Sequence, residues 1–299
     1  MSSEIAKLLA LVQTETGAAA WAAAAATAAE PTGQRVAGVA RTGVGPIDAA
    51  LDLADVTAAR PVVELVGAPG SGKTQTMYRI SATVAMNGAH VLFVDASGTA
   101  DVRLLARSMR GAAGATDALR RVHLFAPGTT AALVATLAML PAYVSERGIA
   151  AAALVVDGLG SQLWIDRRES ALLRLQIKRA TPWFRQQQQL VDTLYAVCGS
   201  LGCVAFAANT LLLRDSAHAA RSAAPNDRTF AVGDHRFRDH MIARWQAVVA
   251  RTFVLENAPC PDRPDLTRIT FQTAGHPARP AHIGPHGLQD QRSSDEGSA

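Results

Sequence analysis

The sequence predicts an α/β fold in which a mostly parallel, twisted sheet carries helices on both faces and ends in an antiparallel C-terminal extension. Three observations lead to this prediction. Apolar runs of strand length alternate with amphipathic, helix-length segments between residues 61 and 208. A glycine-rich loop stands between the first of these strands and the first helix. Near the C-terminal end, three strand-like segments follow one another without a helix between them.

The chain divides into three parts by composition. Residues 1–40 are rich in alanine and have high helix propensity, but they offer few large apolar side chains, so we expect a weakly packed helical segment. Residues 41–288 form the expected core, which begins with a turn-rich entry and a short helix at 48–53. Residues 289–299 are expected to be a disordered tail.

The core elements follow in a regular order. The expected strands are residues 61–66, 90–95, 122–125, 152–157 and 203–208. The expected helices are residues 71–86, 101–110, 129–147 and 181–201. Residues 209–240 are rich in Arg and His and are expected to form a polar loop. The closing strands are expected at residues 245–256, 267–272 and 278–283.

Composition excludes several classes of protein. With 49% apolar and 18% charged residues, the chain has enough apolar side chains for a sizeable core. Apolar runs are too short to span a bilayer, and the N-terminus lacks the pattern of a secretory signal, so we expect a soluble intracellular protein that does not engage a membrane. Cys198, Cys203 and Cys260 lack the spacing of zinc ligands and are expected to be reduced, mostly buried thiols.

The strongest motif is a glycine-rich loop that matches G-x-x-x-x-G-K-[ST] at every defined position. Its glycines let backbone N–H groups surround an anion, and the following helix adds the positive end of its dipole. Lys73 is one of only three lysines and would reach the β- and γ-phosphates, while the Thr74 hydroxyl would bind Mg²⁺. The motif predicts nucleotide contacts from Gly67, Ala68, Pro69, Gly70, Ser71, Gly72, Lys73 and Thr74.

A second part of the predicted site is an acidic strand end. The apolar strand at 152–157 ends in Asp157, which we expect to bind the Mg²⁺ or its water and, with Lys73, to serve catalysis. Asp95 ends the strand after the P-loop helix, and two readings remain open for it: a catalytic acid, or a cap for the turn that leads to Asp101.

These residues support a family resemblance over roughly residues 42–290. The segments 42–51, 64–75, 91–98, 190–210 and 251–288 are similar to RecA-like recombinases of the eukaryotic and archaeal type. Gln75, directly after Lys73 and Thr74, is typical of that group and joins the expected nucleotide contacts. The resemblance implies a RecA-like P-loop NTPase core that uses ATP and Mg²⁺.

Three departures shift the resemblance toward the recombinase paralogues. Active recombinases have a glutamate that polarises the attacking water where this chain has Ser97, and loss of such a base typically costs about 10²- to 10⁴-fold in rate. After Asn209, the family usually has a glutamine that senses the γ-phosphate, and this chain has Thr210. The N-terminal part is also short for the helical DNA-binding domain of a full recombinase. The P-loop and residues 119–125 look most like the D-type paralogue.

The resemblance implies a mediator of homologous recombination and DNA double-strand-break repair. It implies a nucleotide bound between subunits, a weak DNA-dependent ATPase and residence in the nucleus. The implied partners are other recombinase paralogues, the strand-exchange recombinase, and single-stranded or branched DNA, in a hetero-oligomer.

In RecA-like folds, the loops after the fourth and fifth strands face DNA. The first corresponds to residues 158–182, where the basic side chains could equally form a solvated helix face. The second is expected to bind phosphates through Arg214, Arg221, Arg228, Arg236 and Arg238. Trp21 to Ala24 could imitate the aromatic-x-x-Ala plug that such proteins insert into a neighbour, although chance matches are common in alanine-rich sequence.

Two other classes of function stay open at this stage. One is an independent P-loop ATPase or small-molecule kinase, although no acidic constellation for an acceptor is evident in the sequence. The other is a nucleotide-binding scaffold without turnover. Retention of both Lys73 and Thr74 argues against complete loss of nucleotide binding, because folding does not require that pair.

Overall fold

The computed structural model describes residues 41–51, 56, 58–109, 112–162, 182–210, 212–213, 229–232, 235–238, 241–260, 263, 266–284 and 287–290. Several predictions therefore lie outside the described residues. They are the helical segment 1–40 with its Trp21 plug, most of the first DNA-facing loop (163–181), the three arginines Arg214, Arg221 and Arg228, and the end of the tail (291–299).

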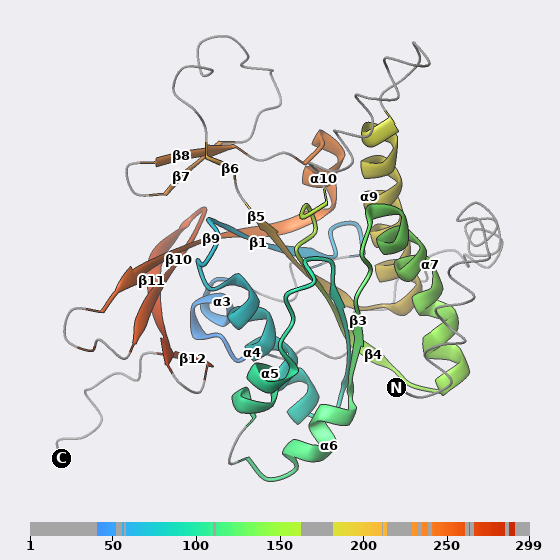
Figure 1. The fold of residues 1–299 in the computed structure, drawn as a ribbon, viewed down its shortest axis with the longest axis horizontal. Coiled ribbons are helices and arrows are strands. Elements are labelled where there is room, and N and C mark those ends of the chain that lie inside the picture. Colours follow the sequence, from blue (N-terminus) through green and yellow to red (C-terminus); the bar gives the residue numbers. More distant parts are fainter. Residues whose placement is uncertain are drawn as a thin grey trace.

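The described part of the chain contains a nine-stranded sheet in the order β12-β11-β10-β9-β1-β5-β4-β2-β3 (Figure 1). Its parallel centre lies close to the predicted strand boundaries. These strands are β1 (Val62–Gly67), β2 (His90–Asp95), β3 (Val122–Phe125), β4 (Ala151–Asp157) and β5 (Val204–Thr210). Burial of β1 and β4 along their whole length explains why they read as unbroken apolar runs.

The C-terminal strands extend this sheet beyond β1. β9 (Val249–Pro259) still runs parallel to β1, and β10 (Thr267–Thr273), β11 (His276–Gly284) and β12 (Gly287–Asp290) follow as antiparallel neighbours. The predicted antiparallel extension is thus confirmed. β12 pairs residues 289 and 290 with β11, so ordered pairing continues two residues into the stretch expected to be a disordered tail.

Helices cover both faces of the sheet, as predicted. One face is covered by α3 (Gly45–Ala50), α4 (Lys73–Met86), α5 (Val102–Ser108) and α6 (Ala115–Arg120). The other is covered by α7 (Thr130–Arg147), α9 (Pro182–Leu201) and α10 (Ala243–Val248). Each face has its own buried apolar cluster, because successive side chains of β1 and its neighbours alternate between the two.

The strand expected at residues 245–256 is confirmed only from residue 249, because its first four residues are helical. Residues 243–248 form α10, and only from Val249 does the chain become β9. The short apolar run around Trp245 is compatible with either structure, so its pattern alone could not decide. In the folded chain, Trp245 is fully buried and its Nε1–H donates to the buried Glu64 carboxylate at 2.6 Å, a contact made across 181 residues of sequence.

The region 209–240 also differs from its prediction as one polar loop. Its described residues contain a second, three-stranded antiparallel sheet in the order β6-β8-β7. These strands are β6 (Leu212–Leu213), β7 (Thr229–Val232) and β8 (His235–Arg238). These strands are only two to four residues long, and the surrounding sequence is rich in Arg, His and Ala. Their alternation of apolar and polar side chains is therefore too short to predict strands from the sequence.

Among the helices that the structure describes, none combines the length and the apolar character needed to cross a bilayer.

Candidate nucleotide site

The predicted phosphate loop lies where the motif requires it. β1 ends at Gly67, and α4 begins at Lys73 after an N-terminal cap at Gly72. The Thr76 N–H donates to the Gly72 carbonyl and closes the first helical turn. Because N–H groups ahead of that bond have no acceptor within the helix, they form a ready site for a phosphate.

Two glycines of the loop are required by packing as well as by ligand access. Gly72 has φ +93°, and a Cβ placed there would lie 2.9 Å from Cδ1 of Ile269 on β10. A Cβ at Gly67 would lie 2.6 Å from the carbonyl oxygen of Leu255 on β9. The C-terminal strands therefore pack closely against the loop. A larger residue at Gly67 would push against backbone, whereas one at Gly72 would strain the left-handed backbone and require Ile269 to shift.

Lys73 is held inside the loop. Its ammonium group donates to the carbonyl oxygens of Gly67 and Ala68, at 2.9 Å each, and to the Ser71 hydroxyl at 3.4 Å. Only 8% of the residue is exposed, and this burial lowers the pKa of Lys73 to about 8, while the nearby Asp157 charge partly opposes the shift. A buried cation within a ring of backbone dipoles is well placed to meet a phosphate.

The two predicted metal ligands meet. The Thr74 hydroxyl, in the first turn of α4, donates to Oδ2 of Asp157, at the end of β4, with a distance of 2.7 Å. Burial raises the pKa of Asp157, the Thr74 hydrogen bond opposes that effect, and the Asp95 charge adds to it. Parallel β1 and β4 end at the same edge of the sheet, which brings together residues 83 positions apart.

This pair fits Mg²⁺ that arrives with a nucleotide. A hydroxyl and a carboxylate are hard oxygen ligands, and Mg²⁺ in such sites is completed by waters and substrate phosphates. Among the described residues, no group of three or more His, Cys, Asp or Glu side chains could hold a metal on its own. The donor set thus suits a metal shared with phosphate oxygens, and Thr74 and Asp157 would be its protein ligands.

Asp95 organises its own loop. Its carboxylate accepts hydrogen bonds from the backbone N–H groups of residues 97, 98 and 100, at 2.7–3.1 Å, and from the Ser97 hydroxyl at 2.6 Å. Of the two readings of this residue, the geometry favours the capping role, because four donors occupy the carboxylate.

Ser97 lies beside the site, as the resemblance implies. A Cβ added to Gly158, the residue after Asp157, would lie 2.7 Å from the Ser97 Cβ. The Ser97 hydroxyl contacts the Asp95 carboxylate and the Thr99 hydroxyl, each at 2.6 Å. A hydroxyl held in this way offers no carboxylate to accept a proton from an attacking water.

The remaining predicted residues are Gln75, two arginines of the small sheet and the three cysteines. Gln75 is half-buried in the first turn of α4, and a Cβ at Gly287 of β12 would approach its Oε1 at 3.5 Å. Arg236 and Arg238 belong to β8 of the small sheet. Cys198 and Cys203 are buried, Cys260 is partly exposed, and all three are free thiols.

One contact to the loop has no signal in the sequence. The Nδ2 of Asn257, near the end of β9, donates to the Gly70 carbonyl at 3.0 Å. The two partners are 187 residues apart in the sequence and come together because β9 pairs in parallel with β1. No local sequence pattern can therefore predict this contact.

Comparison with known proteins supports the fold independently. No family model matches the chain, and no curated protein matches its sequence. Among solved structures, the chain is similar to one described as the crystal structure of the RadB recombinase, with a TM-score of 0.58 and 17% sequence identity. The match covers 84% of this chain and 99% of that chain. The chain therefore has a RecA-like fold, with a P-loop at the carboxyl edge of its parallel strands.

Proposed function

We propose that this chain is an ATP-binding recombinase paralogue that acts as a mediator in homologous recombination and DNA double-strand-break repair. The observation that carries the proposal is the convergence of Lys73, Thr74 and Asp157 at one end of the sheet. The likeness to a recombinase structure supports the same class of function. Within the paralogues, residues 119–125 and the P-loop favour the D-type, and the nucleus is the compartment that this role requires.

Turnover of the bound nucleotide is expected to be slow. Lys73 and the first turn of α4 bind the phosphates, and Thr74 and Asp157 hold the Mg²⁺ that neutralises their charge. We expect activation of the attacking water to be inefficient, because Ser97 stands where active recombinases have a carboxylate. The Asp95 carboxylate is already engaged in hydrogen bonds to its own loop. The protein is thus a weak ATPase, and a scaffold without turnover is the limiting case of the same arrangement.

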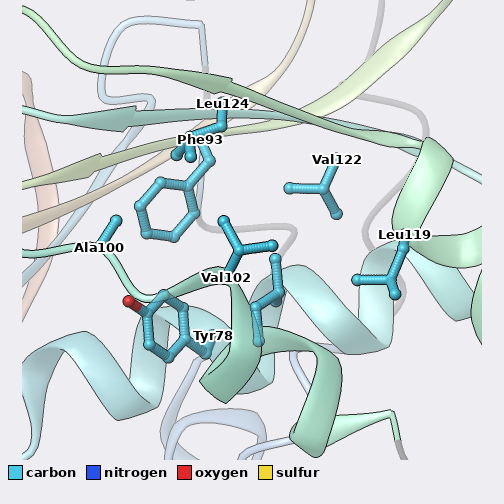
Figure 2. A pocket seen from close by; sticks show the side chains of 8 residues that line it. Tyr78, Phe93, Ala100, Val102, Leu119, Val122 and Leu124 are labelled. Carbon is cyan, nitrogen blue, oxygen red and sulfur yellow. The ribbon is translucent and has the colours of Figure 1, made fainter. Parts of the chain in front are cut away.

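An open sheet edge and an apolar pocket favour assembly with another RecA-like subunit. Among the strands that the structure describes, β3 is the last at its side of the sheet. Beside it, Figure 2 shows a pocket with wholly apolar walls apart from the Tyr78 hydroxyl. Val102 and Leu124 at its rim are 53% and 45% exposed. Its lining residues are Tyr78, Phe93, Ala100, Val102, Leu105, Leu119, Val122 and Leu124.

Such a surface suits a segment that adds a strand to β3 and places a small apolar side chain in the pocket. We propose that a paralogue or the strand-exchange recombinase supplies this segment in a hetero-oligomer. Single-stranded or branched DNA is proposed to contact the region 211–240, where Arg214, Arg221, Arg228, Arg236 and Arg238 supply positive charge.

Nucleotide titration tests the core of this proposal. Calorimetry on the full chain should show Mg²⁺-dependent ATP binding, and the Lys73→Ala variant should bind at least about tenfold more weakly, because a charge-assisted contact is lost. Lys7→Ala removes the same charge outside the motif and should bind like the wild type. If the folded wild-type protein binds no Mg²⁺·ATP, nucleotide binding is excluded and the fold alone remains.

Co-purification tests the assembly. Wild-type protein recovered from cells should bring a RecA-like recombinase or paralogue with it. Recovery reduced by Lys73→Ala would tie assembly to the nucleotide, whereas wild-type protein that purifies without such a partner contradicts the proposed hetero-oligomer.

A further inference from the structure

The C-terminal strands form a wall beside the phosphate loop. Asn257 on β9 is directly opposite Ile269 on β10, so their side chains point to the same face of the sheet. That face meets the loop twice: Asn257 reaches the Gly70 carbonyl, and Ile269 is close to Gly72. Ile283 of β11 adds a third contact, with its Cδ1 3.1 Å from a Cβ placed at Gly72.

The contact at Gly70 holds a peptide that has few other restraints. Gly70 is exposed, has φ +78°, and a Cβ added there would meet no atom within 4 Å. Glycine at the tip of a loop has wide conformational freedom, so a hydrogen bond at this residue removes much of it.

The peptide that joins Gly70 to Ser71 is fixed on both sides. Asn257 donates to its carbonyl, and its N–H donates to the Ala68 carbonyl at 3.1 Å. A peptide unit is planar, so restraining both groups sets the orientation of the whole unit. The following backbone at Gly72 and Lys73, which would surround the phosphates, is thereby positioned as well.

We propose that Asn257 is a positioning residue of the nucleotide site, which orients the tip of the phosphate loop from the C-terminal extension. The extension is then part of the nucleotide site in addition to completing the sheet. This inference rests on the proposed nucleotide binding. It requires no contact between Asn257 and the base. Loss of the Asn257 hydrogen bond should therefore weaken binding of the phosphates, whether or not a base is attached.

Titration of the full chain with Mg²⁺·ATP and with Mg²⁺·tripolyphosphate tests this role. Two variants remove the hydrogen bond: Asn257→Ala, and the isosteric Asn257→Asp, which lacks the donor. Each should lower the affinity for both ligands by about three- to tenfold, the usual range for one hydrogen bond. Gln272→Ala is the matched control, because Gln272 bonds Glu256 on the same pair of strands at 3.0 Å without reaching the loop. It should bind both ligands like the wild type.

Amide hydrogen exchange supplies a readout that a general loss of stability would not produce. In Asn257→Ala, the amide of Ser71, which donates to the Ala68 carbonyl, should exchange faster, whereas the amides of β1 and β4 should be unchanged. Wild-type affinity in Asn257→Ala, or a loss confined to ATP, overturns the positioning role. If the wild type binds neither ligand, the proposed function fails first, and the two failures are thus distinguishable.

Discussion

At the scale of one residue, Gly72 is restricted in two ways, by its backbone conformation and by close packing against the C-terminal strands. Its left-handed backbone (φ +93°) favours glycine, and a Cβ placed there would lie 2.9 Å from Cδ1 of Ile269 and 3.1 Å from Cδ1 of Ile283, so both side chains would have to shift. Gly88 shares the first restriction only, since it has φ +89° and a Cβ there would meet nothing within 4 Å. Alanine substitutions at these two glycines therefore distinguish the cost of backbone strain from the cost of steric contact.

We expect Gly88→Ala to lower the free energy of unfolding by about 1–2 kcal/mol, the cost of a left-handed non-glycine residue. Gly72→Ala should lower it by a further ~1–3 kcal/mol, because overpacking adds to the strain. Urea denaturation measures both values. Equal losses in the two variants would show that Ile269 and Ile283 yield without cost and that packing does not restrict Gly72.

At the scale of elements, a chain of aromatic side chains ties β3 to its neighbours. Nδ1 of His90 on β2 and Nε2 of His123 on β3 lie 2.9 Å apart, and Nδ1 of His123 lies 2.9 Å from the Tyr143 hydroxyl on α7. Burial lowers the pKa of both histidines. The Arg121 charge adds to the shift at His90, and His90 and Arg147 add to it at His123.

A histidine whose pKa is lowered by folding favours the neutral form in the native state. Its contribution to stability is therefore complete above the unfolded pKa of about 6.5 and declines as the pH falls below that value toward the lower folded pKa. We therefore expect the midpoint of urea denaturation to shift to lower urea concentration as the pH is lowered from 7.5 to 5. A His90→Asn/His123→Asn double variant should show a shallower decline, and an unchanged pH profile in that variant would exclude the pair as the cause.

At the scale of the whole molecule, the open edge at β3 predicts where assembly is sensitive to charge. Leu124→Glu places a carboxylate on a residue that is 45% exposed at the rim of the apolar pocket. The change should leave the thermal midpoint of the free protein nearly unchanged and reduce recovery of the RecA-like partner at least about tenfold, because a buried, unpaired charge is costly.

Tyr195 provides the matched control for this experiment. It lies on α9, outside the pocket, and is 41% exposed. Tyr195→Glu should therefore leave recovery of the partner intact. Co-purification measures both variants, and equal loss of the partner in both would place the interface elsewhere.

Short-range information was enough to predict the position of the glycine-rich loop, the position of Asp157 at the end of a strand, and the parallel strands. The loop is contiguous, and its glycines, Lys73 and Thr74 act within one turn of backbone. Apolar runs such as 152–157 predict buried strands because both faces of a parallel sheet are covered. The boundary at β3 (Val122–Phe125) was predicted to the residue.

Long-range contacts decided what these patterns left open. Trp245 is part of a helix whose indole reaches Glu64 on the first strand, and Asn257 holds Gly70 from the last part of the sheet. The choice between two roles for Asp95 depended on where the backbone of its own loop turned. By itself, the sequence determined the residues that we propose to bind phosphate, because the motif they form is local. Only the tertiary structure decided which distant strands support them, because pairing between strands is set by the packing of the whole core.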